Sequence, residues 1–155
     1  MLTAHLPSGY ILARCIRRPV PYLMPAALIG AILPDLDILW FRLVEHAAVH
    51  HHRYWPHIPL IWVAIAAVTL PILRQFGYLH TALVFFAAVF LHLVLDTVAG
   101  GILWGYPWDD TLYHFVTIPP IHHSWVVSIV LHWTFLLEIA IWVVAICLWF
   151  KARRA

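Results

Sequence analysis

Charged residues are scarce in this sequence. Lys and Arg together number nine, and Asp and Glu seven, so only 10% of the 155 residues are charged. Hydrophobic residues make up 64%, and the mean hydropathy is +0.88. Because soluble globular domains carry about 25% charged residues, this composition excludes that class and indicates an integral membrane protein.

Cysteine pairs and the common catalytic motifs are absent as well. Cys15 and Cys147 lie far apart without CxxC spacing, so neither a zinc knuckle nor a redox pair is expected. The chain has no GxSxG, P-loop or GxGxxG motif, so nucleophilic serine catalysis is not supported. The N-terminus lacks the pattern of a cleavable signal peptide, so we expect the first residues, including His5, to belong to the mature fold.

Long apolar runs predict an all-α fold, a single membrane-embedded helical bundle over residues 1–155. The alternating polarity of membrane β-strands is missing, and helices satisfy their own backbone groups in lipid. A bilayer-spanning helix needs roughly 20 apolar residues. We therefore expect a short N-terminal helix and about four transmembrane segments, the first broken and the second short, at residues 6–16, 21–40, 58–73, 79–98 and 124–150.

The basic residues predict the orientation in the membrane. If the four segments cross in alternating directions, seven basic residues lie on one side and only Arg42 and Arg53 on the other. The positive-inside rule then places the C-terminus in the cytoplasm of a bacterial inner-membrane protein. The acidic and histidine-rich segment ends converge on the opposite, periplasmic face. His80 begins the third segment on the basic side and is not expected to join a site there.

Two short motifs bring metal-ligand types together. His92 and Asp96 are four residues apart, so a helix places both on one face, where they can hold one metal ion. Asp35 and Asp37 follow Pro34, which disfavours a regular helix and places the carboxylates on a turn. Without a metal, the first motif would be a hydrogen-bonded pair sealing a helix end, and the second a solvated acidic cap. Both alternatives stay open.

Further imidazoles gather before the second segment. His52 and His57 are potential metal ligands, and the planar guanidinium of Arg53 suits phosphate oxygens. A helix of thirteen residues after His5 and a helix of thirteen residues before Asp35 would each be about 20 Å long. If the two run in opposite directions, His5 and Asp35 lie at the same depth in the membrane. Six other loop histidines are expected to be polar residues at the membrane interface: His46, His50, His51, His114, His122 and His123. Alternatively, one of His114, His122 and His123 is an extra ligand or a proton shuttle.

In their order along the chain, these motifs resemble a known family over residues 5 to about 108. The matching elements are His5, Gly30-Ala31-Ile32-Leu33-Pro34-Asp35-Leu36-Asp37, His52-Arg53-Tyr54-Trp55-Pro56-His57, and His92-Leu93-Val94-Leu95-Asp96 followed by Gly100-Gly101 and Tyr106-Pro107-Trp108. Together they resemble the bacterial membrane-bound metal-dependent hydrolases, which include LexA-regulated inner-membrane hydrolases and are distantly similar to zinc-dependent phospholipase C.

This resemblance implies a centre of one or two divalent ions, with Zn²⁺ as the first expectation and Mn²⁺ or Mg²⁺ as alternatives. The soluble phospholipase also uses a later His-x-x-x-Glu pair, which has no counterpart after Asp96, so a third ion is not implied. The implied ligands are His5, Asp35, His57, His92 and Asp96, with Asp37 and His52 as further ligands or as groups that support them.

The leading hypothesis is a membrane-embedded hydrolase that cleaves phosphoesters of lipids or lipid-linked substrates. Its partners are the bilayer and a phospholipid or lipid-linked phosphate, and no nucleic acid is expected. Asp35 or Asp37 would act as base or bridging ligand, and Arg53 would clamp the phosphate. The expected metal ligands are His5, Asp35, His52, His57, His92 and Asp96, and the expected catalytic residues are Asp37 and Arg53.

Two other functions use the same residues differently. His92 and His132 lie in different apolar segments, as bis-histidine haem ligation in an electron-transfer protein requires. Intramembrane His, Asp and Glu also mark metal or proton transport paths. His132 and Glu138 are six residues apart in the fourth segment, on different helix faces, so each needs its own polar partner.

Overall fold

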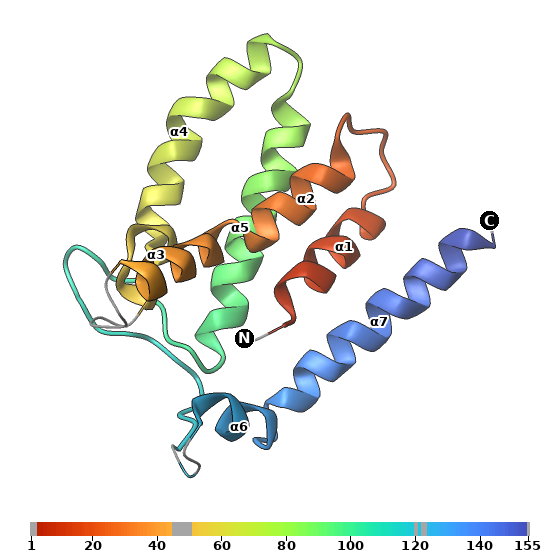
Figure 1. Cartoon of the computed structure of the whole chain (residues 1–155). Coiled ribbons are helices and arrows are strands. Elements are labelled where there is room, and N and C mark those ends of the chain that lie inside the picture. The colour runs from red at the N-terminus through yellow and green to blue at the C-terminus, as the bar shows by residue number, and fades with distance from the viewer. Residues whose placement is uncertain (1–2, 45–50, 120, 122–123, 155) are drawn as a thin grey trace.

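The computed structural model describes residues 3–44, 51–119, 121 and 124–154. Within these residues the regular structure is helical, apart from one isolated antiparallel β-bridge between Ile102 and Tyr113, which confirms the all-α prediction. The elements, shown in Figure 1, are α1 (His5–Cys15), α2 (Leu23–Ile32), η1 (Pro34–Leu36), α3 (Asp37–Leu43), η2 (His51–Arg53), η3 (Trp55–His57), α4 (Pro59–Gln75), α5 (Leu79–Thr97), α6 (Trp125–Val130) and α7 (Phe135–Arg153).

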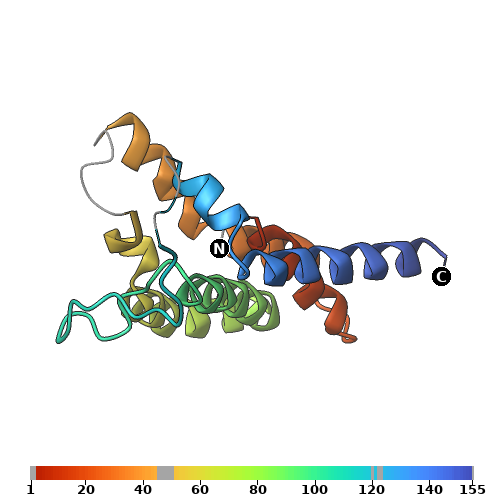
Figure 2. The ribbon, with the colours of Figure 1, turned by 90° about the horizontal axis from the view of Figure 1, so that it is seen from below.

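Helix α5 is the central element. Helices α1, α2 and α4 all pack against it, and α7 packs against α1 (Figures 1 and 2). Because α5 ends at Thr97, the segments that reach its C-terminal end can bring their side chains together there. His80, at the other end of α5, lies sixteen residues before Asp96, or about 24 Å along the helix.

Small residues allow α1, α2 and α5 to approach closely. Gly9 in α1 faces α2 so tightly that a Cβ atom there would lie 2.6 Å from the Cβ atom of Ala31. Gly30 in α2 faces α5, and a Cβ atom there would collide with the backbone carbonyl oxygen of Phe85. Small residues at such positions are the usual means of close helix packing in membranes. This packing brings the start of α1 and the end of α2 to the side of α5.

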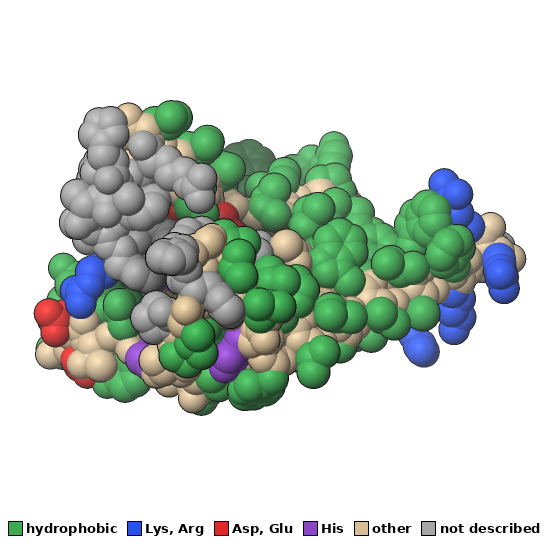
Figure 3. All heavy atoms as spheres, turned by 60° about the horizontal axis from the view of Figure 1, so that its bottom comes forward, with side chains coloured by type: hydrophobic (Ala, Val, Ile, Leu, Met, Phe, Trp, Pro, Cys, Tyr) green, Lys and Arg blue, Asp and Glu red, His purple; other side chains and the backbone are tan. Residues whose placement is uncertain are grey.

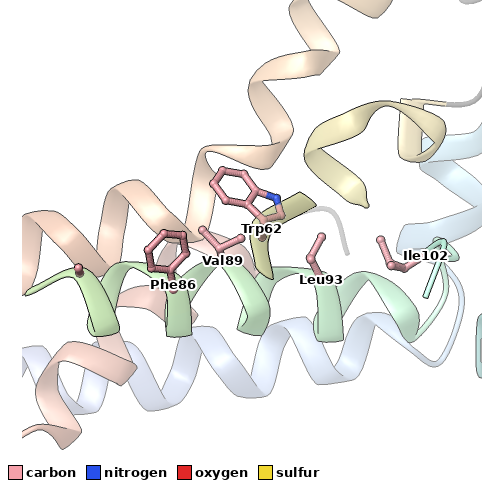
Figure 4. Packing of buried hydrophobic residues seen from close by; sticks show 6 residues of the cluster. Trp62, Phe86, Val89, Leu93 and Ile102 are labelled. Carbon is pink, nitrogen blue, oxygen red and sulfur yellow. The ribbon is translucent and has the colours of Figure 1, made fainter. Parts of the chain in front are cut away.

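A hydrophobic cluster holds α4 and the following loop against α5. Trp62 from α4 packs among Phe86, Val89 and Leu93 of α5, and Ile102 closes the cluster beyond the helix end (Figure 4). The indole N–H of Trp62 also donates a hydrogen bond of 2.7 Å to the carbonyl oxygen of Pro56. The same tryptophan therefore fixes both α4 and the short η3 turn that precedes it.

The expected N-terminal helix forms as α1, but four membrane spans are not confirmed. Helices α5 and α7 are long and apolar enough to cross a membrane, and α2 with the following η1 and α3 gives a third candidate bent by 47°. Helix α4 is apolar but shorter. The fourth predicted segment, 124–150, divides into α6 and α7, with the break at residues 131–134.

The surface of α7 is consistent with contact to lipid. Only 11% of its most apolar stretch is buried, and Figure 3 shows hydrophobic side chains covering this helix. Lys151, Arg153 and Arg154 lie at its C-terminal end, where the same view shows a group of basic side chains. An apolar helix that ends in basic residues is typical of a membrane-spanning segment.

The close packing of α2 on α5 gives a stability prediction. Gly30→Ala would press a methyl group against the Phe85 backbone, which cannot move as a flexible side chain can. We expect a loss of about 1–3 kcal/mol in the free energy of unfolding, measured as a lower midpoint of thermal unfolding in detergent. Ala64→Val enlarges an exposed residue of α4 and should leave the midpoint unchanged. Equal midpoints for all three proteins would contradict this packing.

Candidate metal centre

The six residues predicted as metal ligands lie together at the C-terminal end of α5. They come from five separate elements, and the short turns η1, η2 and η3 contribute three of them. In each of two groups, one ligand atom from every residue lies within 4.8 Å of the others. The first group is His5, Asp35, His92 and Asp96, and the second is His52, His57 and Asp96.

The Asp96 carboxylate is the centre of the cluster. Its Oδ1 atom lies 3.2 Å from Nε2 of His5, and its Oδ2 atom lies 3.0 Å from Nε2 of His92. The Oδ2 atom is also 3.7 Å from Nε2 of both His52 and His57. Asp96 is 1% exposed. A buried carboxylate is costly unless it is paired or binds a cation, so four imidazoles around it indicate such a role.

Three histidines are oriented by hydrogen bonds from their outer ring nitrogens. Nδ1–H of His92 donates to the carbonyl oxygen of Ala31, and Nδ1–H of His52 donates to that of Gly101, each over 2.8 Å. Nδ1–H of His57 donates to Oδ2 of Asp37 over 2.9 Å. Since a carbonyl oxygen only accepts hydrogen bonds, the neutral rings of His52 and His92 carry their lone pairs on Nε2 and direct them to Asp96. Metal-binding histidines are commonly held in this way.

The ligand set also contains two stacked pairs of imidazoles. The rings of His5 and His92 are 3.8 Å apart between centroids, and those of His52 and His57 are 4.6 Å apart. Each pair belongs to one of the two groups, and Asp96 is common to both. Between the pairs, Nε2 of His57 and Nε2 of His92 approach to 3.5 Å. Two ring lone pairs at this distance repel unless a proton or a cation lies between them.

The cluster has one open side. The side chains of His5, His52, His57, His92 and Asp96 are at most 6% exposed, whereas that of Asp35 is 32% exposed. Asp35 Oδ1 lies 3.8 Å from Nε2 of His57 and 3.7 Å from Nε2 of His92. Asp35 therefore touches the ligand atoms on one side and solvent on the other.

Asp37 has a different position from the other carboxylates. Its side chain is 6% exposed and contacts the outer nitrogen of His57, away from the Asp96 carboxylate. Burial lowers the pKa of His57, but the carboxylates of Asp35 and Asp37 beside its ring raise it to about 9. The contact is that of an orienting group, while the predicted catalytic role of Asp37 stays a prediction.

Two glycines after α5 allow the following loop to pack closely against the cluster. Gly100 lies so close to His52 that an added Cβ atom would collide with the imidazole ring. Gly101 has a φ of +81°, the left-handed conformation that glycine commonly provides after a helix. The amides of both glycines donate hydrogen bonds to the carbonyl oxygen of Asp96, at 2.8 and 3.2 Å. The turn thus delivers the Gly101 carbonyl to His52.

Several predicted polar residues lie outside the ligand set. Arg53 is exposed, one residue after buried His52, and no described contact tests its phosphate role. His80 is exposed at the start of α5, as expected. His114 is exposed in the loop and bonds Thr117 Oγ1 at 3.0 Å. The predictions for His46, His50, His122 and His123, and for the side chain of His51, lie outside the described residues.

Two backbone carbonyls that hold the site were not predictable from residue type. Ala31 and Gly101 act only through oxygen atoms that every residue has. The glycine pair four and five residues after Asp96 was a signal for the second contact, because a tight turn there returns the chain towards the helix end. No comparable signal marks Ala31.

Comparison with known proteins identifies the family. Residues 1–154 match the YdjM inner membrane protein family. The chain belongs to this family. The YdjM match agrees with the expected inner-membrane class, and it carries no statement about hydrolysis or about phospholipase C. No curated protein and no solved structure matches the chain.

The hydrogen bond from His57 to Asp37 predicts a strong effect on metal binding. Asp37→Asn keeps the size of the side chain but removes the charge that orients His57. We expect metal affinity to fall about 10- to 100-fold, measured by competition with a chelator. Asp109→Asn is the matched control, since Asp109 bonds Tyr113 and Thr111 in an exposed loop. An unchanged affinity in the Asp37 variant would contradict the orienting role.

The raised pKa of His57 predicts that metal binding releases a proton. Below about pH 9 the metal-free imidazole is protonated, so a metal ion must displace that proton. Metal affinity should therefore rise by about tenfold per pH unit between pH 7 and 8.5 and level off above pH 9. Chelator competition at several pH values measures this slope. A slope of zero over this range would show that no such proton is displaced.

Proposed function

We propose that this YdjM-family chain is a membrane-embedded, metal-dependent hydrolase that cleaves phosphoesters of lipids or lipid-linked substrates. The observation that carries the proposal is the convergence of four imidazole Nε2 atoms and the Asp35 carboxylate around buried Asp96. Backbone and carboxylate acceptors fix three of these imidazoles from outside. Histidines that bind metal ions are typically oriented in this way.

The two stacked histidine pairs support a centre of two ions that share Asp96. His5, Asp35, His92 and Asp96 would hold one ion, and His52, His57 and Asp96 would hold the other. A set dominated by imidazole with carboxylates suits Zn²⁺ first, with Mn²⁺ or Mg²⁺ as alternatives. The donor atoms therefore fit divalent ions in both number and type.

The residues suggest the following division of roles. Divalent ions held here would supply a bound water of lowered pKa and would neutralise negative charge on phosphate oxygens. Asp35, the part-exposed carboxylate, would accept a proton from the attacking water and return one to the leaving alkoxide as the P–O bond breaks. Asp37 holds His57 in its tautomer, and Arg53 binds the phosphate at the open side.

The position of the cluster supports a lipid-type substrate. It lies at the end of α5, an apolar helix long enough to span the bilayer, so the open side of Asp35 is near the level of lipid headgroups. The distribution of basic residues supports an orientation with this end in the periplasm and the C-terminus in the cytoplasm. Multi-pass topology with this orientation is part of the proposal.

Neither rival function is favoured by the contacts. For bis-histidine haem ligation, the ring of His92 would have to leave its stacking on His5 and its bond to Ala31. Its proposed partner His132 instead contacts Thr134 Oγ1 at 3.0 Å. For a transporter, ligands would be expected along the membrane path, but those described gather at one end of α5.

Metal content measured on single variants tests the two-ion centre. Asp96→Ala should lose all bound metal and all phosphatase activity, because its carboxylate contributes to both groups. His92→Ala should lose activity and about half of the metal, and His57→Ala should lose the other half. Elemental analysis of the purified protein gives the metal, and a screen of lipid phosphates and lipid-linked phosphates gives the activity.

The control for this experiment is His114→Ala, an exposed histidine outside the cluster, which should keep metal and activity. Full metal content in Asp96→Ala would refute the centre. Stoichiometric metal without hydrolysis of any phosphoester, combined with metal uptake into proteoliposomes, would favour transport instead. A Soret band in the purified protein would favour haem.

A further inference from the structure

A buried carboxylate outside the metal centre lies beside the start of α1. Glu138, in the first turn of α7, is 2% exposed within a helix whose surface is mainly apolar before its basic C-terminal turn. Its Oε2 atom accepts hydrogen bonds from the backbone N–H of Thr3 at 2.5 Å and from the Thr3 hydroxyl at 2.8 Å. The indole N–H of Trp142, one turn later in α7, donates to the Thr3 hydroxyl at 3.2 Å.

This contact supplies what the beginning of α1 lacks. Helix α1 has no acidic residue in its first turn, and its N-cap residue, Ala4, makes no side-chain capping bond. The N-terminus of a helix carries a partial positive charge and unpaired N–H groups, which a carboxylate stabilises. Glu138 places a carboxylate at this end from a different helix, bonded to Thr3 just before the N-cap residue. It ties the start of α1 to α7, and these two helices are neighbours (Figures 1 and 2).

His5 is two residues from Thr3 and begins α1. It is 3% exposed, its ring stacks on His92, and its Nε2 atom lies 3.2 Å from Asp96 Oδ1. Between the two, Ala4 is fully buried and its carbonyl oxygen accepts the amide of Ser8. A short, hydrogen-bonded link through exposed Thr3 and buried Ala4 thus connects the Glu138 carboxylate to His5.

We propose that Glu138 is a positioning residue of the metal centre: by anchoring Thr3, it holds His5 in the group that also contains Asp35, His92 and Asp96. The inference rests on the proposed metal centre and extends it to α7. It gives the last helix of the chain a functional role, because α7 contributes no described ligand of its own. Without the anchor, His5 would be held only by the packing of α1 and by its contacts with His92 and Asp96.

A double-mutant cycle separates this role from a general effect on stability. Zn²⁺ affinity is measured by chelator competition for the full-length protein, Glu138→Ala, His5→Ala and the double variant. If Glu138 acts through His5, Glu138→Ala weakens Zn²⁺ binding about tenfold or more in the wild-type background. In the His5→Ala background it has almost no further effect. Equal losses in both backgrounds, or no loss in the first, would overturn the proposal.

Hydrogen exchange of the metal-free protein provides a second readout that does not depend on zinc. Glu138→Ala should speed amide exchange in the peptide containing residues 3–9, and unchanged exchange there would overturn the anchor. Glu138→Gln retains one acceptor oxygen and should restore part of the Zn²⁺ affinity. Ile139→Ala, an exposed neighbour in α7, should match the wild type in both measurements.

The outcomes also separate the anchor from the proposed hydrolase. If the cycle shows coupling between Glu138 and His5 but no phosphoester is cleaved, the anchor is supported and the hydrolase is refuted. If the full-length wild-type protein binds no Zn²⁺ at all, the metal centre and the positioning role are both refuted. In that case changed exchange in the first turn of α1 would show only a helix cap.

Discussion

The structure depends on the burial of one carboxylate. Asp96 is almost inaccessible at the end of an apolar helix, and its oxygens face imidazoles from α1, η2, η3 and α5. An ionised group in such surroundings is tolerated only with compensating charge or coordination. Segments that are far apart in the sequence must therefore end at the same point, and the arrangement of α1, α2 and α4 around α5 meets that requirement.

Close backbone contacts are the means by which these segments meet. Gly9 and Gly30 let α1 and α2 approach each other and α5, and this approach brings the Ala31 carbonyl within 2.8 Å of His92. The bend of 47° after α2 then turns Asp35 and Asp37 towards His57. On the other side, Trp62 holds η3 against α5. Helix packing therefore determines where the possible metal ligands lie. A substitution that disturbs this packing should also change their geometry.

Residue pattern predicted the elements of the site better than the membrane topology. The i, i+4 spacing of His92 and Asp96 and the turn at Pro34 both follow from local rules, and both occur. The break in the last segment does not follow from such rules, because residues 131–134 contain no Gly or Pro. Backbone acceptors such as the Ala31 carbonyl oxygen cannot be predicted from residue type, because every residue has one. The pairing of Glu138 with Thr3 joins residues 135 positions apart, and only the folded chain determines which polar partner a buried carboxylate finds.

The charge balance of the cluster links its stability to the proposed chemistry. Asp35, Asp37 and Asp96 are three carboxylates, whereas imidazoles bind metal in their neutral form. The proton held by His57 in the metal-free protein offsets one of these negative charges. Two divalent ions would outweigh all three and leave one positive charge beside the part-exposed Asp35. A site that is acidic without metal and cationic with it would attract an anionic phosphate only in the metal-bound state. Because the same ions would relieve the repulsion that folding imposes on these carboxylates, metal binding would stabilise the fold and prepare the substrate site in one step.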